Sequence, residues 1–319
     1  MPVAHGGALS EAITTYGGDR ADWLDLSTGI NPTAYPVPPI SPEAWQRLPD
    51  EDLVRRCEDA ARAYYHVPDG AFLVATPGTQ AAIQCLDRIL PEGPVEIVEP
   101  CYGEYRHVLV HRAVAAGSAP RGKAVVFGHP NNPDGKTHDL DGFFESYEVL
   151  VADEAFFDAA PDDELQSFVR YTASNNVLVL KSFGKFFGLA GLRLGFAIGS
   201  EETVGKIREL IGPWAVPGPA LEVGTMALAD KRWICETRAR LRNQREALQA
   251  VLLNHGFERV GHTDLFATVH RHDAIGVCEH LARHKILVRS FDYQPSWLRF
   301  GLPTDQKELA RLDAALTLL

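Results

Sequence analysis

The stretch from Val177 to Gly195, VLVLKSFGKFFGLAGLRLG, constrains the possible folds more than any other part of the chain. It opens with four consecutive apolar residues, Val177 to Leu180, which predict a buried parallel strand. A polar and glycine-punctuated turn, Lys181 to Gly191, follows, and a second apolar run starts at Leu194. In open parallel sheets, ligands bind beyond the carboxyl ends of the strands. The turn is therefore a candidate binding site.

Lys185 stands in this turn between Phe183 and the adjacent pair Phe186–Phe187. Aromatic rings exclude water and disfavour the charged ammonium form of a lysine. A neutral, desolvated lysine is a nucleophile suited to Schiff-base chemistry with an aldehyde. Ser182 and Arg193 flank it and supply a hydroxyl and a guanidinium, which suit a phosphate group. An aldehyde and a phosphate in one ligand indicate pyridoxal phosphate (PLP).

Two other interpretations account for a lysine at this place. A lysine that follows a strand is commonly a solvated surface residue. The pair Gly184-Lys185 also occurs in nucleotide-binding P-loops, but that motif needs its first glycine where this chain has Val179. The P-loop is therefore rejected, and Lys185 is predicted to bond the cofactor.

The spacing S-x-x-K-x-x-G-x-x-G-x-R-x-G, from Ser182 to Gly195, resembles the Schiff-base signature of fold-type I PLP enzymes, the aspartate aminotransferase superfamily. One departure is Gly184, where many relatives carry a serine before the lysine. The resemblance extends along nearly the whole chain. It implies an α/β fold, with a mostly parallel sheet in a large PLP-binding domain and a smaller α+β domain.

Predicted strands and helices alternate through the middle of the chain, which is typical of a parallel α/β sheet. The predicted strands are 72–75, 95–98, 124–127, 148–152 and 177–180, and residues 102–115 are predicted to be mostly helical. Three regions are expected: an N-terminal arm with a strand (1–44), the large PLP-binding domain (45–212) and the C-terminal small domain (213–319). The family resemblance implies that the arm contributes to the small domain.

The formal net charge of -11 argues against nucleic acid and anionic membrane surfaces as partners. No apolar run approaches the ~20 residues that a membrane-spanning helix needs. The start, Met1 to Gly7, lacks the features of a signal peptide. Five scattered cysteines fit free thiols in a reducing compartment, so a cytoplasmic protein is expected. His280 and His284 share a predicted helix face, but without further ligands nearby no metal site is expected.

A second candidate for the phosphate is the turn Gly78-Thr79-Gln80, between a predicted strand and a predicted helix. Unpaired N–H groups and the positive end of the helix dipole make a helix N-terminus an anion site. Taken alone, the turn is equally an ordinary helix cap. Ser182, Lys185 and Arg193 strengthen the assignment of all three turn residues to the cofactor.

The family resemblance assigns three further residues to the cofactor. Tyr102 matches the position whose ring stacks on PLP, and Asn132, in an N-P-x-G-like loop, matches the asparagine that hydrogen-bonds its phenolic oxygen. Asp153 ends an apolar strand, and a carboxylate buried there needs a cation. The protonated pyridine nitrogen supplies one, so a depressed pKa is expected for Asp153. Phe156 replaces a tyrosine common in relatives, which removes one hydrogen bond to the phenolic oxygen.

The same resemblance assigns the substrate-binding residues. Arg299 matches the arginine that holds the substrate α-carboxylate, and Arg289 resembles an arginine used for a substrate phosphate. His5, in the N-terminal arm, is assigned to that phosphate and Asn31 to substrate binding. Either arginine could equally be a plain surface residue. Family sites usually form at a dimer interface, so a homodimer is expected, although Leu48 replaces a tyrosine that touches the cofactor phosphate across the dimer.

Three segments, 5–7, 24–32 and 181–191, resemble the threonine-phosphate decarboxylase branch, which acts in cobalamin biosynthesis and is close to histidinol-phosphate aminotransferase. Three functions are compatible with this pattern. They are a lyase that converts L-threonine O-3-phosphate into an aminopropanol phosphate, an aminotransferase acting on histidinol phosphate or a related amino acid, and a non-catalytic PLP-binding regulatory module. Regulatory modules usually come fused to a DNA-binding domain, and an acidic chain disfavours them. The expected partner is a small phosphorylated amino acid.

Overall fold

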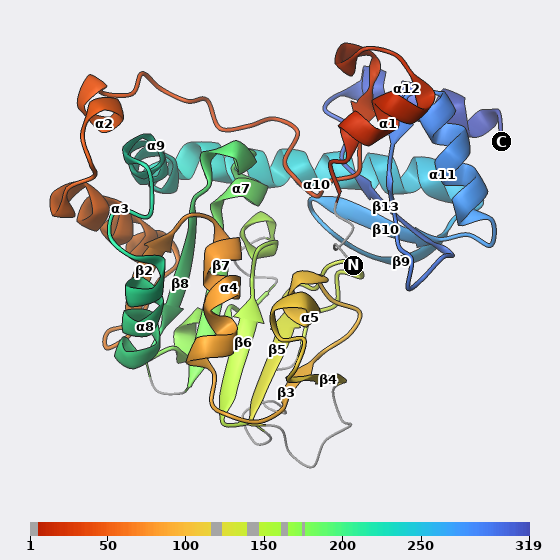
Figure 1. Cartoon of the computed structure of the whole chain (residues 1–319). Coiled ribbons are helices and arrows are strands. Elements are labelled where there is room, and N and C mark those ends of the chain that lie inside the picture. The colour runs from red at the N-terminus through yellow and green to blue at the C-terminus, as the bar shows by residue number, and fades with distance from the viewer. Residues whose placement is uncertain (1–5, 116–122, 139–146, 161–164, 174–175) are drawn as a thin grey trace. The chain divides into compact units, whose positions relative to one another are not determined.

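The computed structural model describes residues 6–115, 123–138, 147–160, 165–173 and 176–319. The chain divides into two compact units, and Figure 1 colours it from the N-terminus to the C-terminus. The large unit comprises Ala34–Asn132 and Lys136–Ile234. The small unit comprises Met1–Thr33, Pro133–Gly135 and Cys235–Leu319. The domain bounds at residues 44 and 212 stay a prediction.

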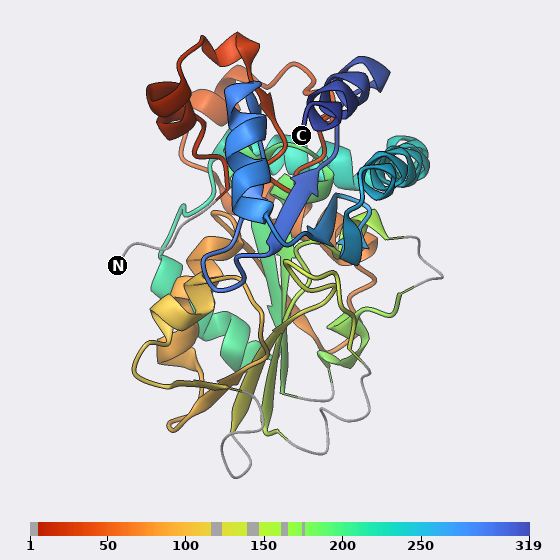
Figure 2. The same cartoon turned by 90° about the vertical axis from the view of Figure 1, so that its right-hand side faces the viewer.

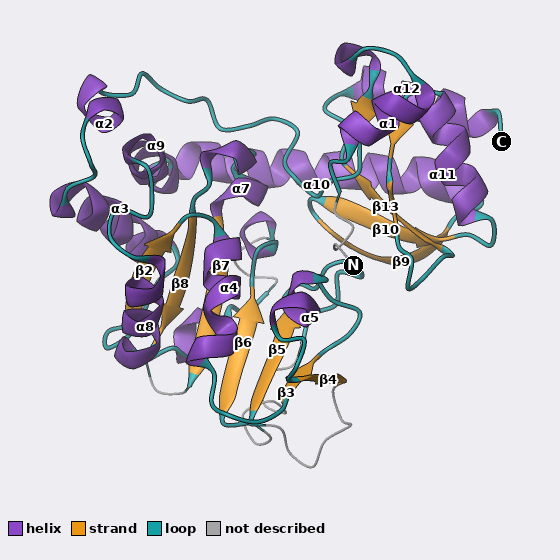
Figure 3. Cartoon of the chain, in the orientation of Figure 1, coloured by secondary structure: helices purple, strands orange, loops and turns teal. Residues whose placement is uncertain are grey.

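A seven-stranded sheet runs through the described part of the large unit (Figure 3). In spatial order its strands are β2 (Phe72–Thr76), β8 (Gly195–Gly199), β7 (Val177–Ser182), β6 (Val149–Asp153), β5 (Ala124–Gly128), β3 (Val95–Ile97) and β4 (Ala113–Ala115). Neighbouring strands are parallel except where β8 pairs with β2 and β7. The predicted mostly parallel α/β sheet is confirmed.

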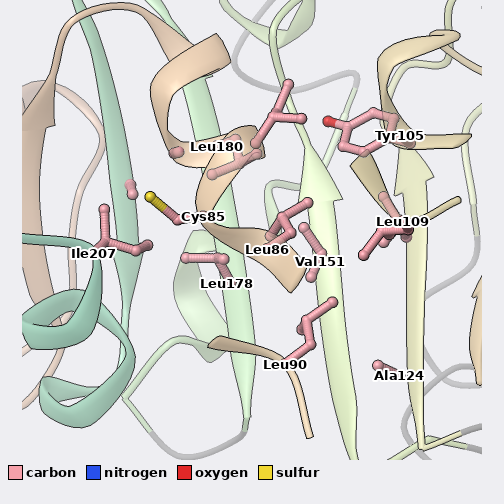
Figure 4. Packing of buried hydrophobic residues seen from close by; sticks show 14 of the residues in the cluster. Cys85, Leu86, Leu90, Tyr105, Leu109, Ala124, Val151, Leu178, Leu180 and Ile207 are labelled. Atoms are coloured by element: carbon pink, nitrogen blue, oxygen red, sulfur yellow. The ribbon is translucent and has the colours of Figure 1, made fainter. Parts of the chain in front are cut away.

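The strands at the centre of this sheet are apolar because they are buried on both faces. All six residues of β7 are buried, and so are the first four of β5. The helices of the large unit are α2 (Pro42–Gln46), α3 (Glu51–Tyr64), α4 (Thr79–Ile89), α5 (Glu104–Val108), α7 (Phe183–Phe186), α8 (Glu201–Ile211) and α9 (Gly218–Ala229). Figure 4 shows Leu86 of α4 beside Val151 and Leu178 of the sheet, in one apolar cluster.

The small unit is built around an antiparallel sheet in the spatial order β12, β13, β10 and β9. These strands are β12 (Arg289–Ser290), β13 (Trp297–Gly301), β10 (Phe266–His270) and β9 (Glu258–Thr263), and β1 (Leu24–Asp25) pairs in parallel with β11 (Ile286–Leu287). Its helices are α1 (Leu9–Tyr16), α11 (Ala274–Arg283), α12 (Gln306–Thr317) and most of α10 (Lys231–Asn254). None of the described helices is long and apolar enough to cross a bilayer.

Two segments differ from the sequence prediction. Residues 102–115, predicted to be mostly helical, form only the short α5, and Ala113–Ala115 then pair with β3 as strand β4. The edge of β3 offers backbone groups that need hydrogen-bond partners, so strand pairing overrides the helical pattern. The N-terminal arm, for which only a strand was predicted, also contains α1, whose apolar face packs on Trp23 and Ala282.

Candidate active site

A pocket opens in the large unit at the carboxyl ends of β2, β5, β6 and β7. Every cofactor residue predicted from the sequence lines it: Gly78, Thr79, Gln80, Tyr102, Asn132, Asp153, Ser182, Lys185 and Arg193. The sheet brings these residues together because parallel strands end at one edge, where each chain turns towards its helix. The sequence separates them by more than a hundred positions, and the fold gathers them around one cavity.

Lys185 reaches the pocket from α7, the short helix that begins directly after β7. Its side chain is half-buried, and its Nζ lies 5.6 Å from the centre of the Phe156 ring. The phenylalanines around Lys185 in sequence are fully buried, and Phe183 stacks on Phe187 with 4.4 Å between ring centres. These rings therefore anchor the helix.

Gly184 explains one departure from the family pattern. A Cβ atom at this position would lie 2.8 Å from the Cα of Ala190, too close for a side chain unless the backbone shifts. The serine found in many relatives therefore does not fit here without rearrangement. The hydroxyl available to an anion at this turn comes instead from Ser182, which lines the pocket.

Asp153 is held at the end of β6 by two hydrogen bonds. Its Oδ2 accepts the Tyr105 hydroxyl at 2.7 Å, and its Oδ1 accepts the Ala155 N–H at 3.0 Å. Burial raises the pKa of Asp153, while the two hydrogen bonds and the charge of Lys185 act in the opposite direction. In the cofactor-free protein the pKa of Asp153 is therefore shifted upwards, which is opposite to the depressed pKa expected beside a pyridinium. That depressed value needs a cation against the carboxylate.

Tyr105 was missed by the sequence analysis. It is fully buried, and the charge of Asp153 and burial raise its pKa well above the ordinary value, with burial the larger cause. The available signal was its position one helical turn after Tyr102, which faces the same pocket. Its partner Asp153 lies on another strand, so the pairing appears only in the fold.

An anion cradle forms where α4 begins. Gly78 has a φ of 75°, and a Cβ there would lie 2.6 Å from a terminal guanidinium nitrogen of Arg193. Only a glycine therefore lets Arg193 approach the first N–H groups of the helix. Arg193 itself adopts a left-handed conformation with φ 54°, and its guanidinium donates to the Ala190 carbonyl at 3.0 Å. A guanidinium beside a helix N-terminus suits a phosphate.

Gln80 uses its side chain within the protein. Its Oε1 accepts the Tyr102 hydroxyl at 3.3 Å, and its Nε2 donates to Oε2 of Glu104 at 2.7 Å. The amide thereby fixes the ring of Tyr102 at the pocket wall. Burial raises the pKa of Tyr102 to about 12, and the Glu104 carboxylate adds to the rise. Glu104, a buried carboxylate, was not among the predicted residues.

Asn132 and its neighbour Asn131 both line the pocket. Asn131 is buried, and its Nδ2 donates to the Pro100 carbonyl at 2.7 Å. This bond ties the loop after β5 to the segment that carries Tyr102. The loop can thus present Asn132 at a fixed place. Phe156, which stands where relatives carry a tyrosine, lines the pocket with an apolar ring.

The predicted substrate arginines lie in the small unit, on neighbouring strands. Arg289 of β12 and Arg299 of β13 are direct cross-strand partners. Burial and the charge of Arg289 lower the pKa of Arg299 to about 10, and burial also lowers that of Arg289. Arg299 donates to the Ser27 carbonyl at 3.0 Å. The fold therefore places two cations of the small unit side by side.

Asn31 is buried in the small unit, where its Oδ1 accepts the Thr33 N–H at 3.0 Å and a guanidinium N–H of Arg240 at 3.4 Å. His5 lies outside the described residues. The rings of His280, on α11, and His284, directly after α11, lie with 4.4 Å between their centres and are tilted by 37°. Among the described residues, no group of three or more histidine, cysteine or acidic side chains is placed to hold a metal ion.

The pocket fits PLP by the chemistry of its groups. A lysine amine, a partly buried carboxylate and a cradle that a Cβ would fill correspond to the aldehyde, the pyridine nitrogen and the phosphate of that cofactor. Burial disfavours the charged form of the Asp153 carboxylate, so the site favours a ligand that brings a positive charge to it. The described side chains thus offer a complementary group to each of these parts of the cofactor.

Comparison with known proteins agrees with this geometry. Residues 112–316 match the family model "Aminotransferase class I and II". The chain is 39% identical to a threonine-phosphate decarboxylase of a Sinorhizobium species, over 99% of this chain and 98% of the relative. It is 38% identical to a threonine-phosphate decarboxylase of Pseudomonas aeruginosa, over 98% of this chain and 97% of the relative.

A solved structure shows the same fold. The histidinol-phosphate aminotransferase of Sinorhizobium meliloti, in complex with pyridoxal-5'-phosphate, superposes with a TM-score of 0.78 at 18% identity. The likeness covers 99% of this chain and 94% of that structure. Sequence model, relatives and fold agree with one another. The chain therefore belongs to the PLP-dependent aminotransferase class I and II family.

Proposed function

We propose that this protein is a PLP-dependent threonine-phosphate decarboxylase, which removes carbon dioxide from L-threonine O-3-phosphate and leaves an aminopropanol phosphate for cobalamin biosynthesis. The observation that carries the proposal is the 39% and 38% identity, over nearly the whole chain, to two relatives of that name. The geometry of both units supports it. The five cysteines are free thiols, which supports a cytoplasmic enzyme.

We assign the pocket residues to the cofactor as follows. Lys185 would bond the aldehyde carbon, Asp153 would pair with the pyridine nitrogen, and Asn132 would hydrogen-bond the phenolic oxygen. The face of Tyr102 would stack on the ring. The phosphate would lie between the first N–H groups of α4, the Ser182 hydroxyl and Arg193. When bound, PLP supplies a conjugated ring that accepts the electron pair of a bond broken at the substrate α-carbon.

Several groups of the chain would act during the reaction. Asp153 would supply a negative charge where positive charge must be stabilised, and the hydrogen bonds donated by Tyr105 and Ala155 favour its ionised form. Phe156 and Tyr102 line the pocket with Lys185, and their rings would exclude water from the space beside it. The Nζ of Lys185 would deliver a proton to the α-carbon once carbon dioxide has left. That proton replaces the carboxylate, so the product is the amine.

The arginine pair supports a substrate with two anionic groups. Facing like charges on adjacent strands destabilise each other, and the lowered pKa of Arg299 reports this repulsion together with burial. An anion between the two would reverse the sign of the interaction. L-Threonine O-3-phosphate carries a carboxylate and a phosphate within one small molecule. We assign Arg299 to the carboxylate and Arg289 to the phosphate, with Asn31 and His5 as further substrate residues.

The choice between decarboxylation and amino transfer depends on substrate orientation. The bond that breaks must stand perpendicular to the cofactor ring, so that its electrons enter the π-system. Arg299 would decide this by holding the carboxylate out of the ring plane. If the α C–H bond stood there instead, the same pocket would serve an aminotransferase.

A homodimer is the assembly we propose. Several large apolar side chains of the large unit are exposed in two short stretches: Val37, Trp45 and Leu48 in one, and Leu210 and Trp214 in the other. Helix α2 packs against the start of α9, where Gly218 approaches Ala44 closely, so the two stretches lead to one region of the unit. Such side chains favour burial against a second copy. Sedimentation equilibrium giving a monomer at assay concentration would refute the dimer.

The deciding experiment for the activity measures two products from two substrates. Purified protein with PLP is incubated with L-threonine O-3-phosphate and, separately, with histidinol phosphate and an oxo-acid acceptor. We expect carbon dioxide from the first and no efficient amino transfer in the second. No carbon dioxide from threonine phosphate, together with efficient transfer from histidinol phosphate, would replace the decarboxylase by the aminotransferase.

A further inference from the structure

A buried ionic cluster lies behind the pocket, on the side of the sheet opposite to the cofactor residues. Its Lys181 Nζ lies 2.6 Å from Oε2 of Glu154 and 3.7 Å from Oδ1 of Asp158. The three side chains are 2%, 0% and 3% exposed, so water does not screen their charges. Lys181 is the lysine nearest to Lys185 in sequence, yet it does not line the pocket.

Two of these charged residues adjoin a pocket residue in sequence. Glu154 directly follows Asp153, the last residue of β6, and Lys181 directly precedes Ser182, the last residue of β7. Successive side chains of an extended chain point to opposite faces of a sheet. Because Asp153 and Ser182 face the pocket, Glu154 and Lys181 face the other side. The backbones are joined as well, because the Glu154 N–H donates to the Leu180 carbonyl at 2.9 Å. The ion pair between Lys181 and Glu154 therefore holds the carboxyl ends of β6 and β7 together.

Further contacts fix the carboxylates of the cluster. Glu154 accepts the Ser167 hydroxyl at Oε2 and the Phe168 N–H at Oε1, both at 2.7 Å. The Tyr65 hydroxyl donates to Oδ2 of Asp158 at 3.3 Å. The Lys181 ammonium also lies 4.1 Å from the centre of the Phe157 ring. The whole turn 153–158 is thus held from behind by charge, hydrogen bonds and an aromatic face.

The energetics favour a positioning role over a purely stabilising one. Replacing a buried ion pair by apolar residues of similar volume is often neutral or stabilising, since the pair must first be stripped of water. Removing only one member is strongly destabilising, because it leaves an uncompensated buried charge. The cluster contains two carboxylates for one ammonium, so the loss of Lys181 would leave two like charges within one turn.

We propose that Lys181, Glu154 and Asp158 are positioning residues, which hold the 153–158 turn so that Asp153 and Phe156 stand at fixed places in the pocket. The inference deepens the cofactor assignment of the proposed function and is independent of the substrate. It names residues that touch neither cofactor nor substrate and act through their sequence neighbours. Without the clamp, the Asp153 carboxylate and the Phe156 ring would lose their fixed distance from Lys185.

The test compares Lys181→Met with a control that destabilises the same unit elsewhere. Ile207→Ala serves as the control, since Ile207 is fully buried in the apolar core on α8. Three quantities are measured on each variant: the free energy of unfolding in urea, the dissociation constant for PLP, and the visible circular dichroism of the bound cofactor. We expect both variants to lose stability. Only Lys181→Met should weaken PLP binding, by about ten-fold or more, and reduce the dichroism signal.

A second variant keeps the test decisive if Lys181→Met does not fold. Glu154→Gln combined with Lys181→Met removes one charge of each sign and keeps an amide oxygen for the N–H and hydroxyl that Glu154 accepts. This pair should recover much of the PLP affinity that Lys181→Met loses. If Lys181→Met does not fold, the double variant should fold and bind PLP more weakly than Glu154→Gln alone, in which Lys181 keeps Asp158 as its counter-ion. Equal PLP affinities of these two variants would overturn the proposal.

The outcomes also separate this inference from the activity. Equal losses of stability in Lys181→Met and Ile207→Ala, with unchanged PLP affinity and dichroism, would show that the cluster only stabilises the fold. A wild-type protein that binds PLP but releases no carbon dioxide would refute the decarboxylase activity. The positioning role could still be tested, because PLP affinity and dichroism do not depend on the substrate. A kcat that falls in Lys181→Met while KM stays constant would agree with a displaced Asp153.

Discussion

Two groups of charged side chains, one in each unit, differ in the charges that meet. In the large unit, the Lys181 ammonium contacts the Glu154 carboxylate, and Asp153 accepts two hydrogen bonds. In the small unit, Arg289 and Arg299 face each other on adjacent strands, and the charge of one lowers the pKa of the other. Internal pairing favours a fixed geometry, whereas facing like charges favour an anion from outside. We infer that the large unit is organised around the cofactor and the small unit around the substrate.

The largest expected effect comes from Lys185→Ala. Because the assigned covalent partner of the cofactor disappears, this variant should lose the yellow absorption band that borohydride abolishes and nearly all turnover, by about 10⁴-fold or more. Spectra and carbon dioxide release measure the two effects. Lys206→Ala is the matched control, since Lys206 is an exposed lysine of the same unit, paired with Glu202 on α8. Retained turnover in Lys185→Ala would break the assignment of the large unit to the cofactor.

Asp153→Asn should have the next largest effect. The substitution keeps the shape of the side chain and a carbonyl oxygen for the Tyr105 hydroxyl, but it removes the charge. We expect PLP to remain bound while kcat falls by about 10²-fold or more, because the stabilising charge acts in the transition state. Rapid-quench assays at saturating substrate measure kcat. Turnover like that of the wild type would rule out a pyridinium partner at Asp153.

The substrate side of the comparison is tested by Arg289→Ala. A charge-assisted contact contributes about 1.5–3 kcal/mol, so the KM for threonine phosphate should rise by about ten-fold or more. A slowly reacting unphosphorylated amino acid should be nearly unaffected, and Arg299→Ala should lower kcat as well. Arg283→Ala on α11 is the control, because Arg283 is an exposed arginine paired with Glu279. Equal losses for phosphorylated and unphosphorylated substrates would exclude Arg289 as the phosphate ligand.

Sequence alone predicted the parts of the site that follow from strand ends. Apolar runs located the strands, and the polar residues after them, such as Asp153 and Ser182, had to meet at one edge of the sheet. The contacts between them could not be predicted, because they join distant segments. Tyr105 lies on α5 and donates to a carboxylate on β6, and Glu154, directly after β6, pairs with Lys181 on β7.

The wrong prediction for residues 102–115 has the same cause, a contact with a segment that is distant in the sequence. Residues 102–115 carry a helical pattern, and only the backbone edge of β3 makes Ala113–Ala115 a strand. Local pattern therefore sets the elements in the interior of the sheet, where apolar runs are long. At an edge of the sheet, hydrogen bonding to the neighbouring strand determines the secondary structure. The direction of the Asp153 pKa shift was similarly set by burial, which the sequence does not measure.

The smallest effect concerns the pH dependence of stability in cofactor-free protein. Burial raises the pKa of Asp153 in the folded state above the ordinary value of about 3.9 expected in the unfolded chain. The folded state then binds more protons than the unfolded state between those two pKa values. The free energy of unfolding must therefore fall as pH rises through that window, by about 1.4 kcal/mol for each pH unit at most.

Urea unfolding across this pH range, with wild type and Asp153→Asn compared, measures the effect. The variant lacks this titrating group, so its curve should fall less than that of the wild type in the window, and above the window the cofactor-free variant should be the more stable protein. Asp59→Asn, at an exposed carboxylate on α3, should follow the wild type. With PLP bound, a pyridinium against Asp153 would depress its pKa and reverse the sign, so that stability is lost as pH falls instead. Parallel curves for wild type and Asp153→Asn in both forms would show that Asp153 is not the carboxylate on which the contrast between the units depends.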